Sequence, residues 1–495
     1  MSVHASLLEQ VERWIGETPD AIAHVVGTRR TSYGELGAMA DAVAAELERL
    51  LPDDGTPVAL FGHKEPEMVA GFLGCLKAGH PYVPIDRAAP AARATVIAEA
   101  AGAAITLTPE SIASLPALVP RDRRSGTQGK PVYVLFTSGS TGVPKGVVIT
   151  ERNLQGFLDW SGQTLSLPEH GGVFLNQASF GFDLSTPDLY WALTRGGTIV
   201  SLTADECGSP RRLLLALRSS EAQYWSSTPS FGGLCLADRS FGEELMPQLE
   251  NVLFCGERLP VSIAAAFLER FPRARVWNSY GPTETTVFVS AIRVDSALLA
   301  EHTALPIGYL MPGLRMTVRD EDGAERPDGE EGELVIGGSV VSPGYLNRPD
   351  LTDRVFGYID GWWSYRSGDL GRKEGALYFC HGRRDLQVKL HGYRIELGDI
   401  EANLRHVPGV RDAAVLPRVR GEGVDSLRAF VVLDDPGAPR DFERALGIRN
   451  ALGELVPPQM VPQHVHFIAA LPLNANGKTD RQRLTALPMQ LVVDA

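Results

Sequence analysis

The chain has 495 residues, of which 44% are hydrophobic and 22% are charged, and its formal net charge is −13. This length exceeds what a single hydrophobic core supports, so we expect at least two domains. The composition is typical of a globular protein, and the negative charge argues against nucleic acid and anionic membranes as partners.

The chain shows no sign of membrane insertion or secretion. No run of about 18 apolar residues occurs, so we expect no transmembrane helix. Glu9, Glu12 and Arg13 stand where a signal peptide would carry its apolar core, so we expect no signal peptide. The cysteines, which form no C-x-x-C pair, make a disulfide framework or a zinc site improbable. We therefore expect a cytoplasmic protein.

Predicted strands and helices alternate in the first part of the chain. Helices are predicted over 5–14, from the 31–36 stretch to Leu50, over 68–77 and over 91–100, with strands over 58–61, 82–85 and 104–107. Ser32 can cap the second helix, with Glu35 three residues later as its reciprocal partner. This alternation predicts a mostly parallel sheet covered by helices on both faces.

A loop of glycines, hydroxyls and one lysine, TSGSTGVPK at 137–145, lies between two predicted strands at 131–136 and 147–150. Glycines let backbone N–H groups approach a ligand, while hydroxyls add donors and lysine adds charge, which suits a polyphosphate. The loop is not a Walker P-loop, because that motif opens a helix. On composition alone, a flexible connector is the alternative.

The pattern changes along the rest of the chain. Helices are predicted over 151–160, 211–218 and 261–269, strands over 172–175, 198–202, 224–227, 252–255 and 276–278, and a turn over 182–185. From about Leu314, short runs separated by glycine and proline predict a β-rich region or barrel. A boundary near 383–385 would leave a small domain with its own α/β alternation.

Five stretches form the most specific pattern. They are the loop at 137–145, NSYGPTETT at 278–286, YRSGDL at 365–370, GRRD at 382–385 continuing to KLHGYRIE at 389–396, and NANGKTDR at 474–481. Each alone could be an ordinary turn, but in this order and spacing they resemble the adenylate-forming enzymes, specifically amino-acid adenylation domains. NQASFGFDLS at 176–185, STPSF at 227–231 and LFCGE at 253–257 look like the stand-alone D-alanine–carrier protein ligases. The resemblance covers the whole chain.

The resemblance implies an α/β fold in two parts. A large N-terminal domain, 1–384, would hold parallel and mixed sheets covered by helices plus a β-rich subdomain. A small mobile C-terminal α+β domain, 385–495, would turn about a hinge at Asp385. ATP and Mg²⁺ are the implied cofactors, and a separate phosphopantetheinylated carrier protein is the implied partner. Carboxylate attack on the α-phosphate needs positioning and charge neutralisation more than acid–base catalysis.

The same resemblance assigns the nucleotide site. The residues expected to hold the β- and γ-phosphates are Thr137, Ser138, Gly139, Ser140, Thr141 and Lys145. Those expected at the adenosine are Gly256, Glu257, Asn278, Tyr280, Asp369 and Arg383. Tyr280 would stack on adenine, and Asp369 would accept the ribose hydroxyls.

The implied catalytic residues are Thr283, Glu284, Arg383 and Lys478. Thr283 would contact the α-phosphate, and Glu284, a hard carboxylate, would bind Mg²⁺. Lys478 would reach in from the small domain and bridge the substrate carboxylate and the phosphate. Rotation at Asp385 would then replace Lys478 and admit the phosphopantetheine thiol.

Asp183 matches the aspartate that pairs with a substrate ammonium. A buried carboxylate is costly unless a cation satisfies it, so Asp183 favours amino acids over fatty or aryl acids. A helix or turn cap is the alternative role. The remaining pocket positions, none of them charged, are Leu184, Pro187, Ser226, Leu253, Cys255, Ser279, Val287 and Phe288.

The pocket residues predict a small amino acid as the substrate, with alanine as the first choice. Phe288 and Pro187 would narrow the site, and Cys255 matches a position associated with D-alanine. Pro187, Ser279 and Phe288 depart from the D-alanine pattern, so chirality stays open. Glycine, L-serine or L-proline activation in natural-product biosynthesis is the first alternative.

Two other classes of enzyme or protein remain as alternatives. An acyl- or aryl-CoA synthetase would share the fold but not need Asp183, and a non-catalytic relative would not need Lys145 or Lys478. GVDSL at 423–427 also resembles the attachment site of a carrier protein at Ser426. A carrier module is a four-helix bundle, whereas the flanks here look like strands around a turn, which disfavours that interpretation.

Overall fold

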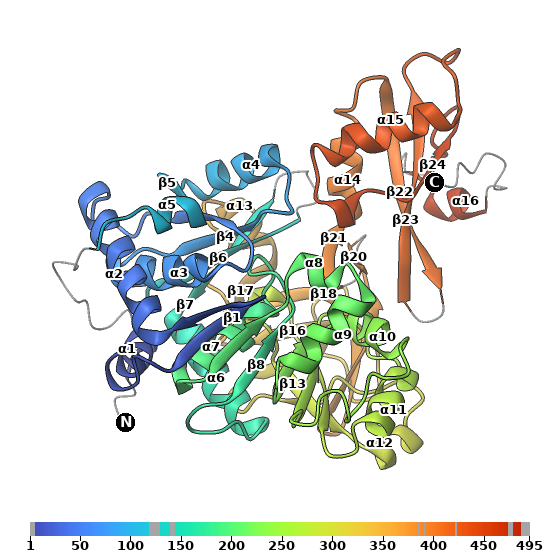
Figure 1. Ribbon diagram of the computed structural model, residues 1–495. Coiled ribbons are helices and arrows are strands. Elements are labelled where there is room, and N and C mark those ends of the chain that lie inside the picture. Colours follow the sequence, from blue (N-terminus) through green and yellow to red (C-terminus); the bar gives the residue numbers. More distant parts are fainter. Residues whose placement is uncertain are drawn as a thin grey trace. The chain divides into compact units, whose positions relative to one another are not determined.

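The computed structural model describes residues 5–117, 129–138, 144–384, 387–390, 392–420, 423–473 and 479–486 (Figure 1). The chain divides into two compact units. The first comprises Met1–Asp86, Ala101–Leu135 and Gly146–Arg384, and the second comprises Arg87–Ala100, Phe136–Lys145 and Asp385–Ala495. The mixed α/β architecture confirms the predicted fold class.

The first of two five-stranded sheets has the strand order β5-β3-β4-β6-β7. Its strands are β3 (Val58–Gly62), β4 (Tyr82–Asp86), β5 (Ile105–Leu107), β6 (Pro131–Thr137) and β7 (Lys145–Thr150). The helices of the first unit in this part of the chain are α1 (Leu7–Glu17), α2 (Tyr33–Leu50), α3 (Pro66–Ala78) and α5 (Pro109–Ala113), whereas α4 (Ala91–Ala101) belongs to the second unit except for its last residue. The β3 strand pairs in parallel with both β4 and β5, as the alternation of elements predicts.

Two of these helices show how the local sequence sets the structure. Ser32 caps α2 as predicted, because its Oγ accepts from Glu35 N at 3.2 Å and the Glu35 carboxylate accepts from Ser32 N at 2.8 Å. Every residue of α3 is buried, and its two charged side chains are paired: Glu67 with Arg29, and Lys77 with Glu12 and Asp41.

The larger sheet has the order β14-β13-β12-β11-β10-β8-β9-β1-β2. Its strands are β1 (Ile22–Val26), β2 (Arg29–Ser32), β8 (Val173–Asn176), β9 (Thr198–Ser201), β10 (Tyr224–Ser227), β11 (Asn251–Phe254), β12 (Arg275–Tyr280), β13 (Ser290–Val294) and β14 (Tyr309–Leu310). The central strands from β12 to β1 are parallel, and the pairs at both ends are antiparallel. Ligands of such sheets bind beyond the carboxyl ends of the parallel strands.

Helices connect the strands of the larger sheet. They are α6 (Glu151–Thr164), α7 (Ser185–Arg195), α8 (Ala204–Cys207), α9 (Pro210–Ser219), α10 (Pro229–Leu236), α11 (Val261–Arg270), η1 (Thr283–Thr285) and α12 (Ser296–Glu301). Phe254 and Phe267 bring β11 and α11 together in a buried cluster that also holds Trp225 of β10. This core fixes the strand ends at which the candidate site forms.

The β-rich region after Leu314 is an antiparallel sheet with the order β15-β16-β18-β17, and β19 pairs with β18. Its elements are β15 (Arg315–Arg319), β16 (Gly332–Gly337), α13 (Pro349–Val355), β17 (Phe356–Ile359), β18 (Trp362–Glu374) and β19 (Leu377–Arg383). The register of the β18–β19 pair places Asp369 opposite Arg383, so two predicted site residues are neighbours across the strands.

The C-terminal part of the second unit contains the hairpin β20–β21 and a sheet with the order β22-β23-β24. Its elements are β20 (Gln387–Leu390), β21 (Tyr393–Glu396), α14 (Leu397–Leu404), β22 (Val410–Arg420), β23 (Gly423–Leu433), α15 (Phe442–Gly453), η2 (Pro458–Met460), β24 (His464–Phe467) and α16 (Arg481–Thr485). Ser426 lies inside β23 and is buried, not in the wider turn that we predicted. A strand residue without access to solvent does not fit a carrier attachment site.

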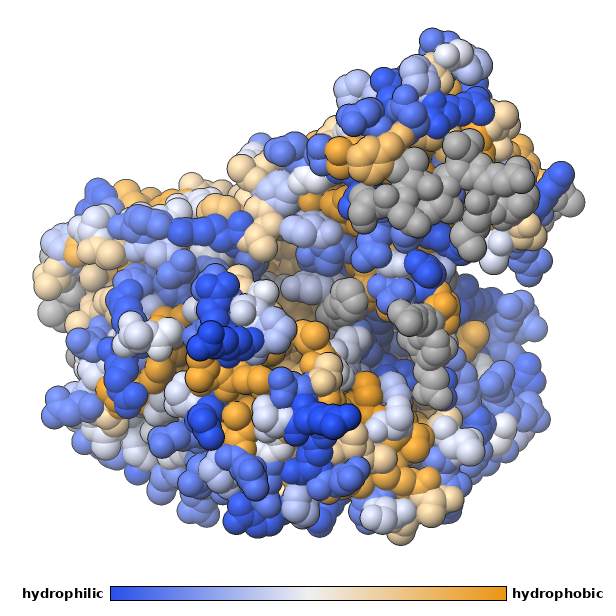
Figure 2. Space-filling view, turned by 45° about the vertical axis from the view of Figure 1, so that its right-hand side comes forward, coloured by the Kyte–Doolittle hydropathy of each residue, from blue (hydrophilic) through white to orange (hydrophobic). Residues whose placement is uncertain are grey.

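Within the part of the chain that the structure describes, no helix is both long and apolar enough to cross a membrane. Hydrophilic residues surround the hydrophobic patches on the face shown in Figure 2. This surface is typical of a globular protein.

Candidate active site

Thr283 and Asp183 meet, although 100 residues separate them in the sequence. Thr283 begins η1 after a two-residue connection from β12, and Asp183 precedes α7, whose N-cap residue is Leu184. The Thr283 hydroxyl donates to Asp183 Oδ2 at 2.6 Å, and both side chains are buried. The residue predicted to contact the α-phosphate therefore touches the residue predicted to bind an ammonium.

Glu284 follows at the next position and is fully buried. Its Oε1 accepts a hydrogen bond from the Tyr345 hydroxyl at 2.7 Å, and its backbone carbonyl accepts from Ser342 N at 2.9 Å. These contacts fix the carboxylate that we predicted as a metal ligand. Tyr345 was not predicted from the sequence, because no motif surrounds it and its contact with Glu284 spans 61 residues.

Tyr280, Asp369 and Arg383 form a connected group. Asp369 Oδ2 accepts from the Tyr280 hydroxyl at 2.6 Å, and Oδ1 accepts from Arg383 Nη1 at 2.7 Å. Burial, followed by the nearby Asp369 charge, raises the pKa of Tyr280 well above its usual value. Each carboxylate oxygen retains a lone pair, so Asp369 can still accept hydrogen bonds from the two hydroxyls of a diol.

The residues predicted beside adenine lie at the ends of β11 and β12. Gly256 has a φ of +88°, a left-handed backbone conformation that residues other than glycine rarely adopt. Glu257 Oε2 accepts from Ser230 N at 2.9 Å in the first turn of α10. Asn278 donates from Nδ2 to the Pro306 carbonyl at 2.7 Å, so its side chain ties β12 to the segment before β14.

The predicted pocket residues are buried and come from neighbouring strand ends. Ser226 of β10 lies opposite Leu253 of β11, and the Ser279 hydroxyl of β12 donates to the Phe254 carbonyl at 2.9 Å. The apolar members that share one hydrophobic cluster are Leu184, Leu253, Cys255, Val287 and Phe288, and Pro187 is buried in the first turn of α7. The structure thus places uncharged side chains around this part of the site.

A tight turn holds Phe288. Thr286 and Val287 have φ of +61° and +69°, and Phe288 N donates to the Thr286 carbonyl at 2.9 Å across Val287. A γ-turn of this kind is strained, especially for a β-branched residue. A Cβ on Gly281 would lie 2.4 Å from Phe288 Cα, so only glycine fits beside the turn. The Phe288 ring packs against Phe157 with ring centroids 4.8 Å apart.

The described ends of the predicted phosphate loop belong to the second unit. The Ser138 hydroxyl donates to the Arg394 carbonyl at 2.8 Å and accepts from Glu396 N at 3.0 Å. Lys145 Nζ lies 4.0 Å from Glu396 Oε1, and Thr137 Oγ1 is buried with no hydrogen-bond partner in the described ranges. Gly139, Ser140, Thr141, Asp385 and Lys478 lie outside the described residues.

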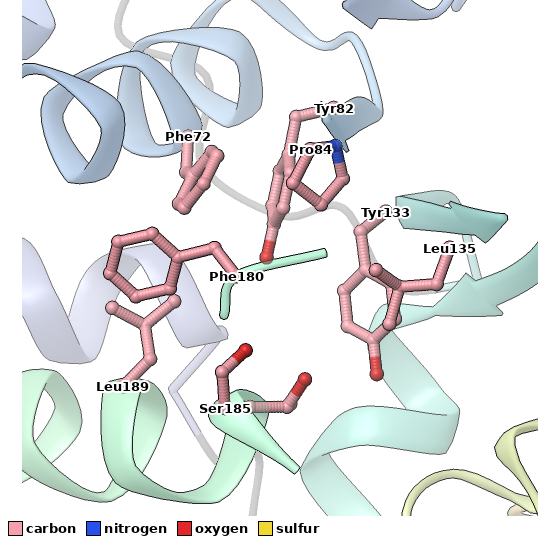
Figure 3. A pocket seen from close by; sticks show the side chains of 9 residues that line it. Phe72, Tyr82, Pro84, Tyr133, Leu135, Phe180, Ser185 and Leu189 are labelled. Atoms are coloured by element: carbon pink, nitrogen blue, oxygen red, sulfur yellow. The ribbon is translucent and has the colours of Figure 1, made fainter. Parts of the chain in front are cut away.

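A small cavity lies behind the first turn of α7 (Figure 3). Phe72, Phe180 and Leu189 stand on one side of it in this view, and Tyr133 and Leu135 stand on the other. Its volume of about 10 Å³ has room for a single water molecule, which the nearby hydroxyls could bind. The cavity is therefore too small to receive an amino acid.

Comparisons with known proteins give matches over almost the whole chain. The model of the AMP-binding enzyme family matches residues 11–346, and that of the AMP-binding enzyme C-terminal domain matches residues 399–478. The D-alanine–D-alanyl carrier protein ligase of Bacillus mycoides is 41% identical over 97% of this chain and 98% of its own length.

Solved structures share the fold. Holo-PA1221, an NRPS protein containing adenylation and PCP domains, superimposes with a TM-score of 0.80 at 26% identity, covering 97% of this chain and 84% of that one. The adenylation domain AlmE of Vibrio cholerae, in complex with glycyl-adenosine-5'-phosphate, has a TM-score of 0.82 at 22% identity, covering 98% and 99%.

Proposed function

The chain belongs to the AMP-binding enzyme family, and from that premise we propose that it is an AMP-forming amino acid–carrier protein ligase. It activates a small amino acid, alanine first, as the aminoacyl adenylate with ATP. It then transfers the aminoacyl group to the phosphopantetheine thiol of a separate carrier protein. Support for this reaction comes from the carrier protein ligases that resemble the chain over nearly its full length.

The contact between Thr283 and Asp183 carries the proposal. In an α-amino acid, one carbon atom separates the ammonium from the carboxylate. A substrate whose ammonium pairs with Asp183 therefore presents its carboxylate beside Thr283, 2.6 Å from Asp183. Thr283 is the residue proposed to contact the α-phosphate that this carboxylate attacks. The site thus holds the two reacting groups together, which is the main source of rate enhancement in such a reaction.

We assign the nucleotide to the residues that the sequence motifs predict for it. Asp369, oriented by Tyr280 and Arg383, accepts the ribose hydroxyls, while Gly256 and Glu257 border the adenine. Lys145 and the hydroxyls of the 137–145 loop neutralise the pyrophosphate that leaves. Glu396 lies 4.0 Å from Lys145, so the bound polyphosphate competes with a carboxylate for this lysine.

Glu284 fits a role as the Mg²⁺ ligand. Mg²⁺ in nucleotide sites is commonly held by one or two carboxylates together with phosphate oxygens. Glu284 supplies a carboxylate that is buried and fixed by Tyr345. The ion would neutralise charge on the phosphates, and Thr283 at the adjacent position would hold the α-phosphate.

The C-terminal residues, 385–495, are proposed to act as a mobile lid that turns at Asp385. Lys478 on this lid would bridge the substrate carboxylate and the α-phosphate during adenylation. Its withdrawal would make room for the carrier thiol in the second half-reaction. Because the reaction consumes ATP, we infer that the protein acts in the cytoplasm.

Other small amino acids are the main alternative substrates. Glycine, L-serine and L-proline also fit an uncharged pocket, and one missing methylene changes binding by only about 1–3 kcal/mol. An acyl- or aryl-CoA synthetase is less compatible, because a buried carboxylate at Asp183 would face an apolar acid.

ATP–pyrophosphate exchange with D-alanine, L-alanine, β-alanine, glycine, serine and proline tests the proposed substrate class. We expect exchange above background with alanine, and hydroxylamine should trap the alanyl adenylate as its hydroxamate. Exchange restricted to D-alanine would favour a D-alanine ligase, whereas strongest exchange with serine or proline would favour the biosynthetic alternative. Failure of every amino acid to support exchange would refute the proposal.

A further inference from the structure

The segment between β8 and α7 carries Asp183 at its C-terminal end. Local hydrogen bonds shape it: Phe182 N donates to the Ser179 carbonyl at 2.9 Å, and Thr186 N donates to the Asp183 carbonyl at 2.9 Å. These turns set the conformation of the segment. They do not set its place relative to Thr283, on which the amino-acid site depends.

A buried lysine from a distant loop holds the start of this segment. Lys64 lies between β3 and α3 and is 1% exposed. Its ammonium donates to the Asn176 side-chain carbonyl and to the Ala178 carbonyl, and it stands 4.8 Å from the centre of the Phe180 ring. One cation therefore contacts three residues in the stretch that leads to Asp183.

Asn176 extends these contacts to α7. Its Nδ2 donates to Asp188 Oδ2 at 3.4 Å, so the amide bridges the lysine and a carboxylate one turn after Asp183. The Ser201 hydroxyl donates a hydrogen bond to the same Asn176 oxygen at 3.1 Å. Its Oγ is also hydrogen-bonded to His24 Nε2 at 2.9 Å. Lys64 therefore contacts the start of the segment directly, and through Asn176 it is connected to Asp188 of α7, just beyond the end of the segment.

The neighbouring residue acts on the same segment. His63 Nδ1 lies 2.8 Å from Asp86 Oδ2, and the Ser179 hydroxyl donates to that carboxylate oxygen. Ser179 Oγ in turn accepts from Gly181 N at 3.2 Å. Two consecutive residues of the β3–α3 loop therefore connect to the backbone on either side of Phe180.

Burying a lysine at this position costs more free energy than burying an apolar side chain would. Burial lowers the pKa of Lys64 to about 7, with Asp188 opposing the shift, and burial raises the pKa of Asp188 to about 8. Burial thus disfavours the charged form of both groups, and apolar side chains often replace such buried ionisable groups without loss of stability. The pair is therefore better explained by the geometry it imposes than by stability.

We propose that Lys64 is a positioning residue for the amino-acid site, which through Asn176, Ala178 and Asp188 places Asp183 for the substrate ammonium. This inference rests on the proposed function, because it takes Asp183 as the ammonium partner. Lys64 itself touches neither substrate nor nucleotide. Its effect is on how well the enzyme distinguishes an amino acid from the same acid without its ammonium.

The test compares K64M with K77M in the full chain. Lys77 of α3 is a matched control, because it is also buried and pairs with Glu12 at 2.5 Å and Asp41 at 2.6 Å, outside the segment. We expect K64M to raise the KM for alanine roughly tenfold, the change expected when a buried hydrogen bond to a charged group is lost. The preference in kcat/KM for alanine over propionate should fall similarly, while the KM for ATP stays within twofold. K77M should lower the melting temperature and leave both KM values unchanged.

A second variant keeps the test decisive if K64M is too unstable. K64M removes the nearby positive charge that favours the ionised form of buried Asp188, which is expected to cost stability. K64M/D188N removes both charges and should show the same rise in the KM for alanine. The inference would be overturned if K64M and K64M/D188N both kept the wild-type KM for alanine and the wild-type preference for alanine over propionate. It would also be overturned if K77M raised the KM for alanine as much as K64M does. Two further outcomes separate the inference from the proposed function. If D183N keeps the wild-type preference for alanine, Asp183 is not the ammonium partner and the inference about Lys64 fails, whereas the proposed function fails only if no amino acid supports exchange in the wild type.

Discussion

The hydroxyl of Thr283 offers the sharpest single-atom test of the site. Replacing Thr283 with valine keeps the side-chain volume and removes the donor to Asp183 Oδ2, a bond of 2.6 Å between buried groups. Hydrogen bonds to charged groups contribute about 1.5–3 kcal/mol. Loss of this bond should therefore lower kcat/KM for alanine by about 10- to 150-fold. The decrease should be larger if the hydroxyl also contacts the α-phosphate.

Thr285 supplies the matched control in the same turn. Its hydroxyl donates to the Pro282 carbonyl at 3.0 Å and reaches no predicted ligand. The T285V variant should lose about 0.5–1.5 kcal/mol of stability with little change in kcat/KM. ATP–pyrophosphate exchange measures the activity of both variants, and thermal unfolding measures their stability.

A double-mutant cycle with D183N shows whether the two residues act together. In the D183N background, T283V should have a smaller effect than in the wild type, because the charged partner has gone. Equal effects of T283V and T285V, or strictly additive effects of T283V and D183N, would refute the coupling that the contact implies.

Three further predictions concern other parts of the candidate site. Y345F removes the hydroxyl that fixes Glu284 and should raise the Mg²⁺ concentration needed for half-maximal exchange severalfold, which a magnesium titration would detect. G281A places a Cβ 2.4 Å from Phe288 Cα and should sharply lower the melting temperature or abolish folding, whereas G357A, with nothing within 4 Å, should not. K478A should cut adenylation severely while ATP binding, measured by calorimetry, largely survives; near-normal turnover would contradict the assigned role.

Local rules in the sequence predicted much of the fold. The Ser32–Glu35 capping box, the parallel pairing of β3 with β4 and β5, and the β-rich region after Leu314 all follow from residue patterns over a few positions. The prediction of a turn around Ser426 was wrong, because β22 and β23 pair well beyond their most apolar residues.

Contacts between distant parts of the chain could not be predicted in this way. Tyr345 and Lys64 lie outside the recognised motifs, and the proposed role of each rests on a partner 61 or more residues away. The left-handed conformation of Val287 contradicts its local preference, and such strain is held in place by surrounding structure. The sequence resemblance named many candidate site residues, but the contacts between them could be seen only in the folded structure.

The most direct test of the central claim is the ratio of kcat/KM for alanine to that for propionate, measured by AMP formation in wild type and D183N. These substrates differ only in the ammonium. The wild type should strongly prefer alanine, and D183N should lose most of that preference while its KM for ATP changes little. An unchanged preference in D183N would show that the ammonium is recognised elsewhere and would contradict the account.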